Sequence, residues 1–280
     1  MVLLHVKKTD NDQFIYQTSL TEPVEEATVH LTELHNKRLL TDRIAMSLEE
    51  LIKFGALKPE TTRGLQEGDP EEPPRPDLIK APDEHHYRIG WAVPTELGLR
   101  ILETTTAAKQ LLNKANADRR VPVAVEQLEE ACSLMKGALM MAYPGYHTLE
   151  PWEPVVMLLE GREVETLLRG EELLRPENIS IWFAGKELQR GKLLSHFIKG
   201  TEQTKVIIKM QKVGAGAPVR EPMVDPETQK QMIAMYHKRQ EEAKVLGVDS
   251  EDDYLNSAWA DPRKLKRDLH GTSDIGWRPR

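Results

Sequence analysis

The stretch that decides the fold is residues 179–211, ISIWFAGKELQRGKLLSHFIKGTEQTKVIIKMQ. Its first part, ISIWFAG, is rich in β-forming residues and runs into a glycine, which predicts a strand and then a turn. A second glycine turn at Gly191 precedes a short helix-forming run. The last part, KVIIKMQ, alternates between apolar and polar residues and predicts another strand. Residues 179–211 are therefore predicted to be the second half of a mixed α and β fold.

The first half of that fold is predicted at the N-terminus. MVLLHVK, residues 1–7, alternates so that Val2, Leu4 and Val6 share one face of a strand. QFIYQTS at 13–19 predicts a second strand, and the turn residues before it make the two a hairpin. A helix is expected from Thr21 to the Asn-Lys-Arg run at 36–38. Its apolar stripe is expected to lie across the hairpin and consists of Val24, Ala27, Leu31 and Leu34.

Residues 39–178 are predicted to be a helical insertion. A short helix over 47–54 is followed at 58–90 by prolines interleaved with acidic residues, which is typical of a linker or an extended loop. Two long helices, over 95–117 and 122–142, are joined by a short connection that favours an antiparallel pair. A further helix is predicted over 163–174. The tail, 213–280, is predicted to contain a helix over 225–247 and then an extended arm bearing aromatic and basic residues.

The composition excludes several classes of protein. The chain has 280 residues, a net charge of −7 and one cysteine. An acidic balance argues against nucleic acid as a partner, because such binding needs a basic surface. One cysteine cannot form an intramolecular disulfide, which indicates a reducing compartment. No apolar run is long enough for a membrane span, and the N-terminus lacks the pattern of a signal peptide. We therefore expect a soluble, intracellular protein.

Motifs that carry enzymatic or metal chemistry are missing from the sequence. Gly185-Lys186 is followed by Glu187, whereas a phosphate-binding loop needs serine or threonine there. The zinc-binding spacings HExxH and CxxC do not occur, nor does the GxSxG turn of hydrolases. Cys132 falls at a core position of a predicted helix, where an inert thiol is expected. The sequence thus predicts no enzyme, no cofactor and no metal site.

The predicted order of elements is that of a β-grasp fold. Residues 181–211 resemble the second half of ubiquitin through FAGK at 183–186, the turn at Gly191 and the last strand. The resemblance implies an α+β fold in which 1–38 and 179–212 form a ubiquitin-like domain interrupted by 39–178. It also places Trp182 at an exposed hydrophobic recognition position, the alternative being that Trp182 packs against the insertion. The chain continues past Gly216, so conjugation through a free diglycine end is not expected.

Motifs at both ends of the chain resemble the Kurly family of cilia- and flagella-associated proteins. They are MVLLHVK at the start, GAGAPVREP at 214–222, YLNSAWAD at 254–261, LKR at 265–267 and the terminal WRPR at 277–280. The resemblance implies a role in motile cilia, in the assembly of axonemal dynein arms, with no enzymatic activity. Such a protein is expected in the cytoplasm and in the motile cilium, at the axoneme and basal body.

Two functions compete as expectations. The first is an adaptor or assembly factor whose partners are axonemal dynein subunits or dynein assembly factors. The second is a resident component of the axoneme that docks on tubulin or other axonemal proteins. A scaffold for ubiquitin receptors is a third, weaker hypothesis, because the ubiquitin-like domain is interrupted. The residues expected to bind partners are Trp182, Tyr254, Trp259, Lys266, Arg267, Trp277, Arg278 and Arg280.

Overall fold

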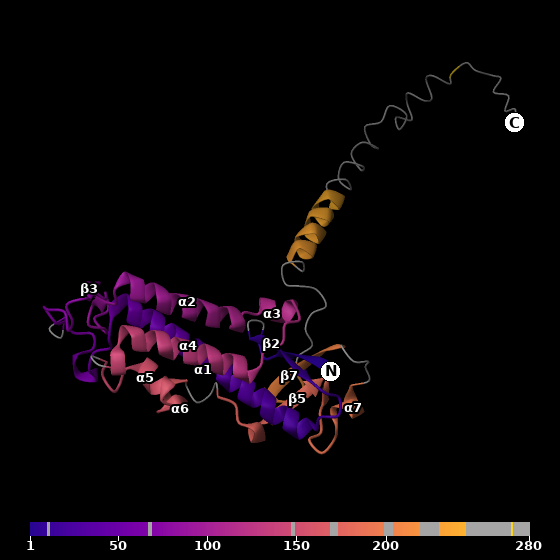
Figure 1. The fold of residues 1–280 in the computed structure, drawn as a ribbon. Coiled ribbons are helices and arrows are strands. Elements are labelled where there is room, and N and C mark those ends of the chain that lie inside the picture. Colours follow the sequence, from indigo (N-terminus) through magenta and orange to yellow (C-terminus); the bar gives the residue numbers. More distant parts are fainter. Residues whose placement is uncertain are drawn as a thin grey trace. The chain divides into compact units, whose positions relative to one another are not determined.

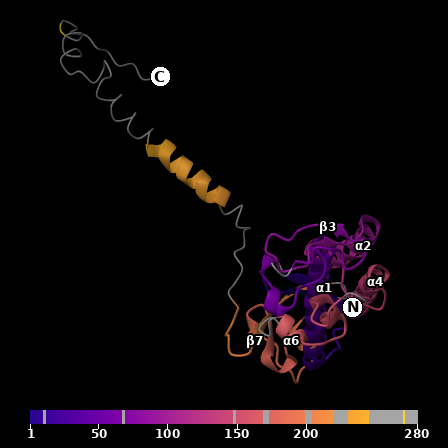
Figure 2. The same ribbon diagram turned by 90° about the vertical axis from the view of Figure 1, so that its left-hand side faces the viewer.

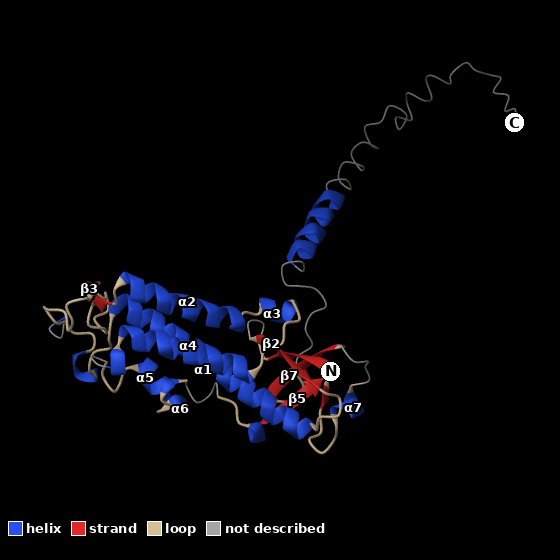
Figure 3. Cartoon of the chain, viewed as in Figure 1, coloured by secondary structure: helices blue, strands red, loops and turns tan. Residues whose placement is uncertain are grey.

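The computed structural model describes residues 1–9, 12–66, 69–146, 149–168, 173–198, 204–218, 230–244 and 270. The chain divides into two compact units, Met1–Pro218 and Val219–Arg280. Figure 3 shows the main sheet of the first unit at one of its ends, a short strand at the opposite end, and helices along the length between them. In the second unit, residues 230–244 form a helix, which confirms the central part of the helix predicted over 225–247. The predicted mixture of α and β structure is confirmed.

A five-stranded mixed sheet is built from strands at the beginning and at the end of the first unit's sequence. Its strands are β1 (Val2–Lys7), β2 (Gln13–Thr18), β5 (Ile179–Phe183), β6 (Lys186–Glu187) and β7 (Lys205–Lys212). They lie in the order β2-β1-β7-β5-β6, with β1 and β7 parallel and the other neighbours antiparallel. The N-terminal hairpin and the strands predicted over 179–185 and 205–211 are therefore confirmed. The two-residue strand β6 lies in the segment predicted as a turn.

One long helix, α1 (Val24–Phe54), covers one face of the sheet with its first half (Figure 1). Leu31 and Leu34 are buried there against alternate residues of the strands, as their helical spacing predicts. The prediction of two helices, one ending near 38 and one starting at 47, is wrong. No glycine or proline lies between residues 24 and 54. The side chain of Asn36 bonds the backbone of Leu174 in both directions, at 2.8 and 2.9 Å, so it does not compete for the helix backbone.

The second half of α1 packs against the antiparallel pair α2 (Thr95–Leu112) and α4 (Val125–Ala142) (Figure 1). A second core lies between these helices and includes Ile44, Leu48, Leu51, Ile101, Met135 and Leu139. The predicted extension of the first of these helices to residue 117 is wrong. The side-chain amide of Asn116 donates to the carbonyl oxygens of Gln110 and Leu111 at 2.7 and 3.1 Å, which ends α2 and turns the chain into α3 (Ala115–Asp118).

Shorter elements complete the first unit. The helix α5 (Pro154–Leu159) was not predicted, and α6 (Val164–Leu167) replaces the longer helix expected over 163–174. Since Asn36 binds both the N–H and the carbonyl of Leu174, that residue is held outside a helix. The remaining elements are α7 (Leu194–Phe197) and the 3₁₀ turns η1 (Glu60–Thr62), η3 (Pro144–Tyr146) and η4 (Pro176–Asn178).

The proline-rich segment at 58–90 is an extended loop tied to the ends of the helices, not a free linker. Its strand β3 (Ile79–Lys80) pairs with β4 (Trp91–Ala92), and Figure 2 views the first unit from this side. Lys58 and Arg88 are buried in it, at 1% and 4% exposure. Gly55 ends α1 with a φ of 78°, and a Cβ there would lie 2.2 Å from the carbonyl oxygen of Trp91. Only glycine allows the loop to return so closely to the helix.

Candidate functional site

The face of the sheet that α1 does not cover is the first candidate for a functional surface. Side chains alternate along a strand, so the residues that do not point into the core under α1 lie on the opposite face. On β1, β7 and β5 these are Leu3, His5, Lys7, Lys205, Ile207, Lys209, Gln211, Ser180 and Trp182. These residues lie near the beginning and near the end of the first unit's sequence, and the pairing of the strands brings them together.

Part of this opposite face is covered near β2. The backbone N–H of Val123 donates to the carbonyl of Ile15 at 3.0 Å, and the ammonium of Lys205 donates to the carbonyl of Ala117 at 3.2 Å. Ile15 is fully buried and His5 is 3% exposed as a result. Ile207, in the central strand β7, is by contrast 48% exposed. The face is therefore closed over β2 and open over β7 and β5.

Trp182 lies on the open part of the face. Its indole N–H donates to the Oγ of Ser180 at 2.9 Å, which orients the ring along β5, and the side chain is half-buried. In the sheet register it stands between Lys209 of β7 and Glu187 of β6. The sequence-based expectation that Trp182 binds a partner stays a prediction. Its position on an uncovered sheet face is the geometry that such a role needs.

Three lysines surround Trp182 and Ile207 on the same face, and sequence analysis missed them. Lys7 and Lys209 share one register position of the parallel pair β1 and β7, and Lys205 faces Leu3 two rows away. Burial lowers the pKa of His5, and the positive charges of Lys205 and Lys7 lower it further. The alternation of KVIIKMQ, with lysines on one face of its strand, was the signal that could have found two of them. We call Leu3, Lys7, Trp182, Ile207 and Lys209 the open sheet face.

The other expected partner-binding residues, Tyr254, Trp259, Lys266, Arg267, Trp277, Arg278 and Arg280, lie outside the described residues. The described helix of the second unit, over 230–244, has an exposed apolar stripe. Met232, Ile233, Met235 and Tyr236 are 60%, 51%, 75% and 63% exposed. Docking by the tail therefore stays a prediction, and this stripe is the described feature that favours it.

A polar cluster joins the N-terminal hairpin to α1. His35 is 1% exposed, with its Nδ1 3.3 Å from Asp12 and its Nε2 3.0 Å from the ammonium of Lys8. Arg38 reaches Asp12 at 3.2 Å and stacks over Phe14, 4.7 Å from the ring centre. Burial opposes ionisation of Asp12, but the hydrogen bond from His35 and the charges of His35, Arg38 and Lys8 outweigh it and lower its pKa. An Asp–His pair can act as a general base, but here both imidazole nitrogens are engaged, so the arrangement holds the hairpin to α1.

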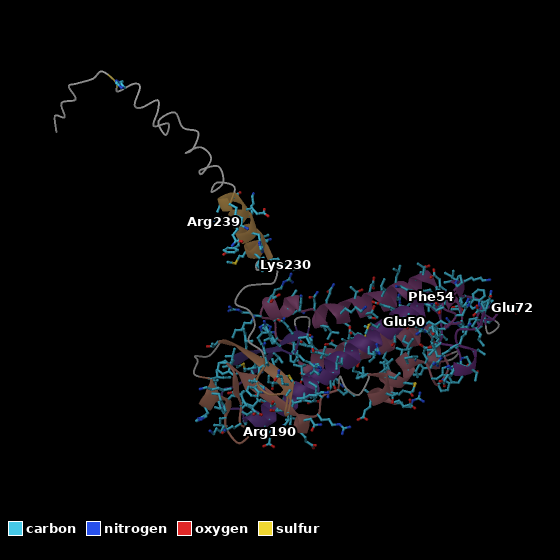
Figure 4. The ribbon with its side chains drawn as sticks, turned by 180° about the vertical axis from the view of Figure 1, so that it is seen from behind. Glu50, Phe54, Glu72, Arg190, Lys230 and Arg239 are labelled. Carbon is cyan, nitrogen blue, oxygen red and sulfur yellow. The ribbon has the colours of Figure 1, made fainter. Side chains whose placement is uncertain are left out.

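A second polar network fixes the extended loop at the other end of the first unit. Glu153 is fully buried and accepts hydrogen bonds from the backbone of Leu57 at 2.7 Å and from Arg88 at 3.1 Å. Arg88 also donates to the carbonyl of Gly55 at 2.8 Å and to Glu50 at 3.1 Å. Figure 4 labels Glu50 near Phe54, at the end of the unit that carries Glu72 and away from Arg190. Each link joins two separate elements, so the network positions the loop.

The groups that could carry nucleophilic or metal chemistry are few within the described residues. The Sγ of Cys132 lies 3.4 Å from the hydroxyl of Thr41, and burial raises the pKa of the thiol. A raised pKa leaves little of the reactive thiolate at neutral pH. Across the described ranges, no three histidine, cysteine, aspartate or glutamate side chains are grouped so that they could hold a metal ion. Nor does that part of the chain contain a helix long and apolar enough to cross a membrane.

Comparison with known proteins gives consistent matches along the whole chain. A model of the family described as cilia- and flagella-associated protein 298 matches residues 179–275. Cilia- and flagella-associated protein 298-B of Xenopus laevis is 37% identical over 282 residues, covering 100% of both chains. The protein of that name from Homo sapiens is 36% identical over 292 residues, again covering 100% of both. The one from Drosophila melanogaster is 32% identical over 290 residues and 99% of both. No solved structure gives a significant match.

Proposed function

The chain belongs to the cilia- and flagella-associated protein 298 family, and from this premise we propose that it is a non-enzymatic adaptor in the assembly of axonemal dynein arms. The relatives' names connect the family with cilia and flagella. The step from cilium association to dynein-arm assembly is our proposal. The observation that carries the adaptor role is the open sheet face, where Ile207 of the central strand is 48% exposed and Trp182 of the next strand is half-buried.

A rigid sheet with a partly exposed aromatic residue suits protein binding, because a preformed surface loses little conformational freedom when a partner docks. Aromatic residues are enriched among those that dominate binding energy at interfaces. The two buried polar networks favour a non-enzymatic role in another way. Both tie separate elements together, the hairpin to α1 and the extended loop to α5, and their ionisable groups are engaged in doing so.

We further propose that the sheet and the first half of α1 form a ubiquitin-like β-grasp, with residues 39–178 as an insertion. The support is the sequence of elements: a hairpin, a helix across its face, and then a strand and a final strand that lies parallel to the first. The insertion leaves and re-enters beside the sheet, where Asn36 of α1 is hydrogen-bonded to Leu174. Loop closure across those contacts costs little additional entropy as an insertion grows, so the interruption is compatible with a folded domain.

The function is tested by removing the protein from a ciliated cell. Cells that lack it should retain dynein heavy chains at reduced levels in the cytosol and should lose dynein arms from the axoneme, with motility lost accordingly. Re-expression of the full chain should restore all three. If axonemal dynein content is normal in cells lacking the protein, the proposed role in dynein-arm assembly is wrong.

The alternative function, a resident axonemal component, is favoured by the exposed apolar stripe of the 230–244 helix, which suits a stable protein contact. Quantitative immunoblotting of demembranated axonemes against cell-body cytosol separates the two. Enrichment in the cytosol supports the assembly adaptor. Salt-resistant retention near stoichiometry with a dynein subunit supports the resident component.

A further inference from the structure

A strap from the insertion passes around the β2 edge of the sheet. Residues 113–124, which we call the strap, connect α2 to α4 and contain α3. The chain leaves the α1 side of the sheet at the end of α2, where the carbonyl of Leu112 accepts from Arg38 at 3.4 Å. α3 packs against β2 on the other side, and Val123 then returns to the core under α1 (Figure 1). The strap therefore closes the outer edge of β2, the strand at one edge of the sheet.

Two hydrogen bonds tie the strap to strands of the sheet within the described residues. The ammonium of Lys205 in β7 donates to the carbonyl of Ala117 at 3.2 Å. The backbone N–H of Val123 donates to the carbonyl of Ile15 in β2 at 3.0 Å. Between these two contacts Arg120 has a φ of 62°, a left-handed conformation that residues with a Cβ rarely adopt. Closing the strap thus strains its backbone, and losing either hydrogen bond favours opening.

His5 of β1 lies on the side of the sheet that the strap covers, where it is 3% exposed. Its Nε2 lies 3.0 Å from the side-chain oxygen of Gln13, and because an amide oxygen only accepts, Nε2 carries the proton of the neutral ring. Nδ1 is buried, and no group among the described residues forms a hydrogen bond with it. A second proton must go to Nδ1, where it would make a buried, charged donor with no acceptor. The closed strap therefore disfavours an imidazolium at His5.

The charged groups around His5 add to this conflict. Burial lowers the pKa of His5 most, and the positive charge of Lys205 in β7 lowers it next. The hydrogen bond with Gln13 raises that pKa and Lys7 in β1 lowers it, while Asp118 in the strap raises it with the smallest influence of the five. Since Lys205 also anchors the strap, a positive charge on His5 repels the anchor itself.

We propose that the strap is a cover released by acid: a proton on Nδ1 of His5 detaches residues 113–124 from the sheet and uncovers β2. Opening lets water solvate the imidazolium and separates Lys205 from the strap. The uncovered edge presents Ile15 and the backbone groups of β2, and an open strand edge of this kind can pair with another chain. The device goes beyond the proposed function and does not depend on it.

The direction of the effect follows from proton linkage. Because the closed state holds the pKa of His5 below its ordinary value of 6.5, the open state binds more protons in acid. Acid therefore favours opening as the pH falls through 6.5, and pH has little effect well above that value. About one pH unit below it, a solvated imidazole is protonated about ten times more often than it is neutral, so the opening equilibrium should rise about tenfold.

The test is hydrogen–deuterium exchange of the full-length protein at about pH 7.5 and about pH 5.5, read by mass spectrometry and corrected for the pH dependence of the intrinsic exchange rate. Peptides from the strap and β2 report the opening. Peptides from β5 and the first half of α1 are the reference segments. We expect exchange in the strap and β2 to be about tenfold faster at the lower pH, with little change in the reference segments.

Three variants assign the effect to His5. His5→Gln keeps a side-chain N–H for Gln13 and removes the nitrogen that takes the proton, so the acceleration by acid should be lost. Asp118→Asn removes the negative charge that the strap places near His5, so the acceleration should become larger. Asp118 is exposed, so this variant still tests the proposal if circular dichroism shows that His5→Gln does not fold. His196→Gln, at an exposed histidine of α7, is the matched control and should behave as the unmodified protein does.

Four results would overturn the proposal. They are exchange in the strap that is the same at both pH values, acceleration that is equal in the reference segments, acceleration that persists in His5→Gln, and acceleration in Asp118→Asn that is no larger than in the unmodified protein. Equal acceleration in the reference segments would mean that acid unfolds the whole first unit, with no separate release of the strap.

Discussion

Replacing Arg88 with methionine should destabilise the first unit strongly, because it isolates a buried carboxylate. Glu153 is fully buried, and Arg88 is its charged partner, with Nη1 3.1 Å from Oε1. In the Arg88→Met variant Glu153 keeps one donor, the backbone N–H of Leu57 at 2.7 Å. The carbonyl of Gly55 also loses its hydrogen bond from Arg88. The exposed carboxylate of Glu50 loses its hydrogen bond from Arg88 as well. One substitution therefore removes three hydrogen bonds that tie the loop to the end of α1 and to Glu153.

The expected cost is about 3–5 kcal/mol, the range for breaking a buried ion pair by removing one partner. Because the N–H of Leu57 still donates to Glu153, the cost of Arg88→Met should lie toward the lower end of this range, at about 3 kcal/mol. With an m-value of about 2 kcal/mol/M, the midpoint of urea unfolding should fall by about 1.5 M. Arg162→Met is the matched control. Arg162 lies only 2.7 Å from Glu160, but both side chains are exposed, at 47% and 40%, so its loss should cost no more than about 1 kcal/mol.

The pH dependence gives the prediction a second, independent signature. Burial raises the pKa of Glu153, and the charge of Arg88 partly opposes that rise. An acid whose pKa is raised in the folded state holds more protons folded than unfolded, so stability falls as pH increases through that range. Without Arg88 the pKa rises further. The loss caused by Arg88→Met should therefore be smaller at about pH 5 than at about pH 8.

The assay is urea unfolding followed by circular dichroism at both pH values. The double variant Arg88→Met with Glu153→Gln should be more stable at pH 8 than Arg88→Met alone, because the uncharged amide can stay buried and accept from Leu57. If Arg88→Met costs no more than the Arg162→Met control, or if its cost is independent of pH, then Glu153 is not the buried charge that this reasoning requires.

Three further predictions concern other parts of the first unit. Leu31→Ala should lower the unfolding free energy by about 3 kcal/mol, because Leu31 is fully buried under the sheet, whereas Val29→Ala at 43% exposure should cost well under 1 kcal/mol; urea unfolding measures both. Asp12→Asn should be destabilising at neutral pH. The pKa of Asp12 is lower in the folded protein than in the unfolded chain, so its carboxylate stabilises the fold above the unfolded-state pKa, and this contribution is lost as the pH falls through the folded-state pKa. The unfolding free energies of the variant and the unmodified protein should therefore become equal in acid, and a difference between them that does not change with pH would contradict this. Cys132 should react with iodoacetamide more slowly at pH 8 than free cysteine does, because burial raises its pKa; an equal rate would show a more accessible thiol.

The local elements were predictable because their signals are local. Alternation in residues 1–7 and 205–211 predicted strands, and the burial of Val2, Leu4 and Val6 confirms the predicted face. Helical spacing predicted which side of α1 would face the sheet, since Leu31 and Leu34 recur at helical intervals. Motifs of sequence were also sufficient to predict a ciliary family, to which the chain belongs.

The errors have a common physical origin in long-range contacts. Asn36-Lys37-Arg38 looked like a helix end, but Asn36 is bound to Leu174 and Arg38 to Asp12, and the helix continues. The proline-rich segment was predicted as a linker or an extended loop, and what decides for the tied loop is again distant, because Arg88 is buried in contacts with Gly55 and Glu153. A local pattern cannot show that a distant partner satisfies a polar side chain.

The sequence by itself determined the strands β1, β2, β5 and β7, the apolar face of α1 and the family, because each of these depends on the spacing or motifs of neighbouring residues. Only the tertiary structure decided which residues make a surface together. Lys7, Trp182 and Lys209 belong to three strands, and strand order and register place them in one row. Packing over β2 then buries Ile15 and leaves Ile207 open, although both are isoleucines in the same sheet. Spacing decides the side of a strand on which a residue lies, and the fold decides whether that side is covered.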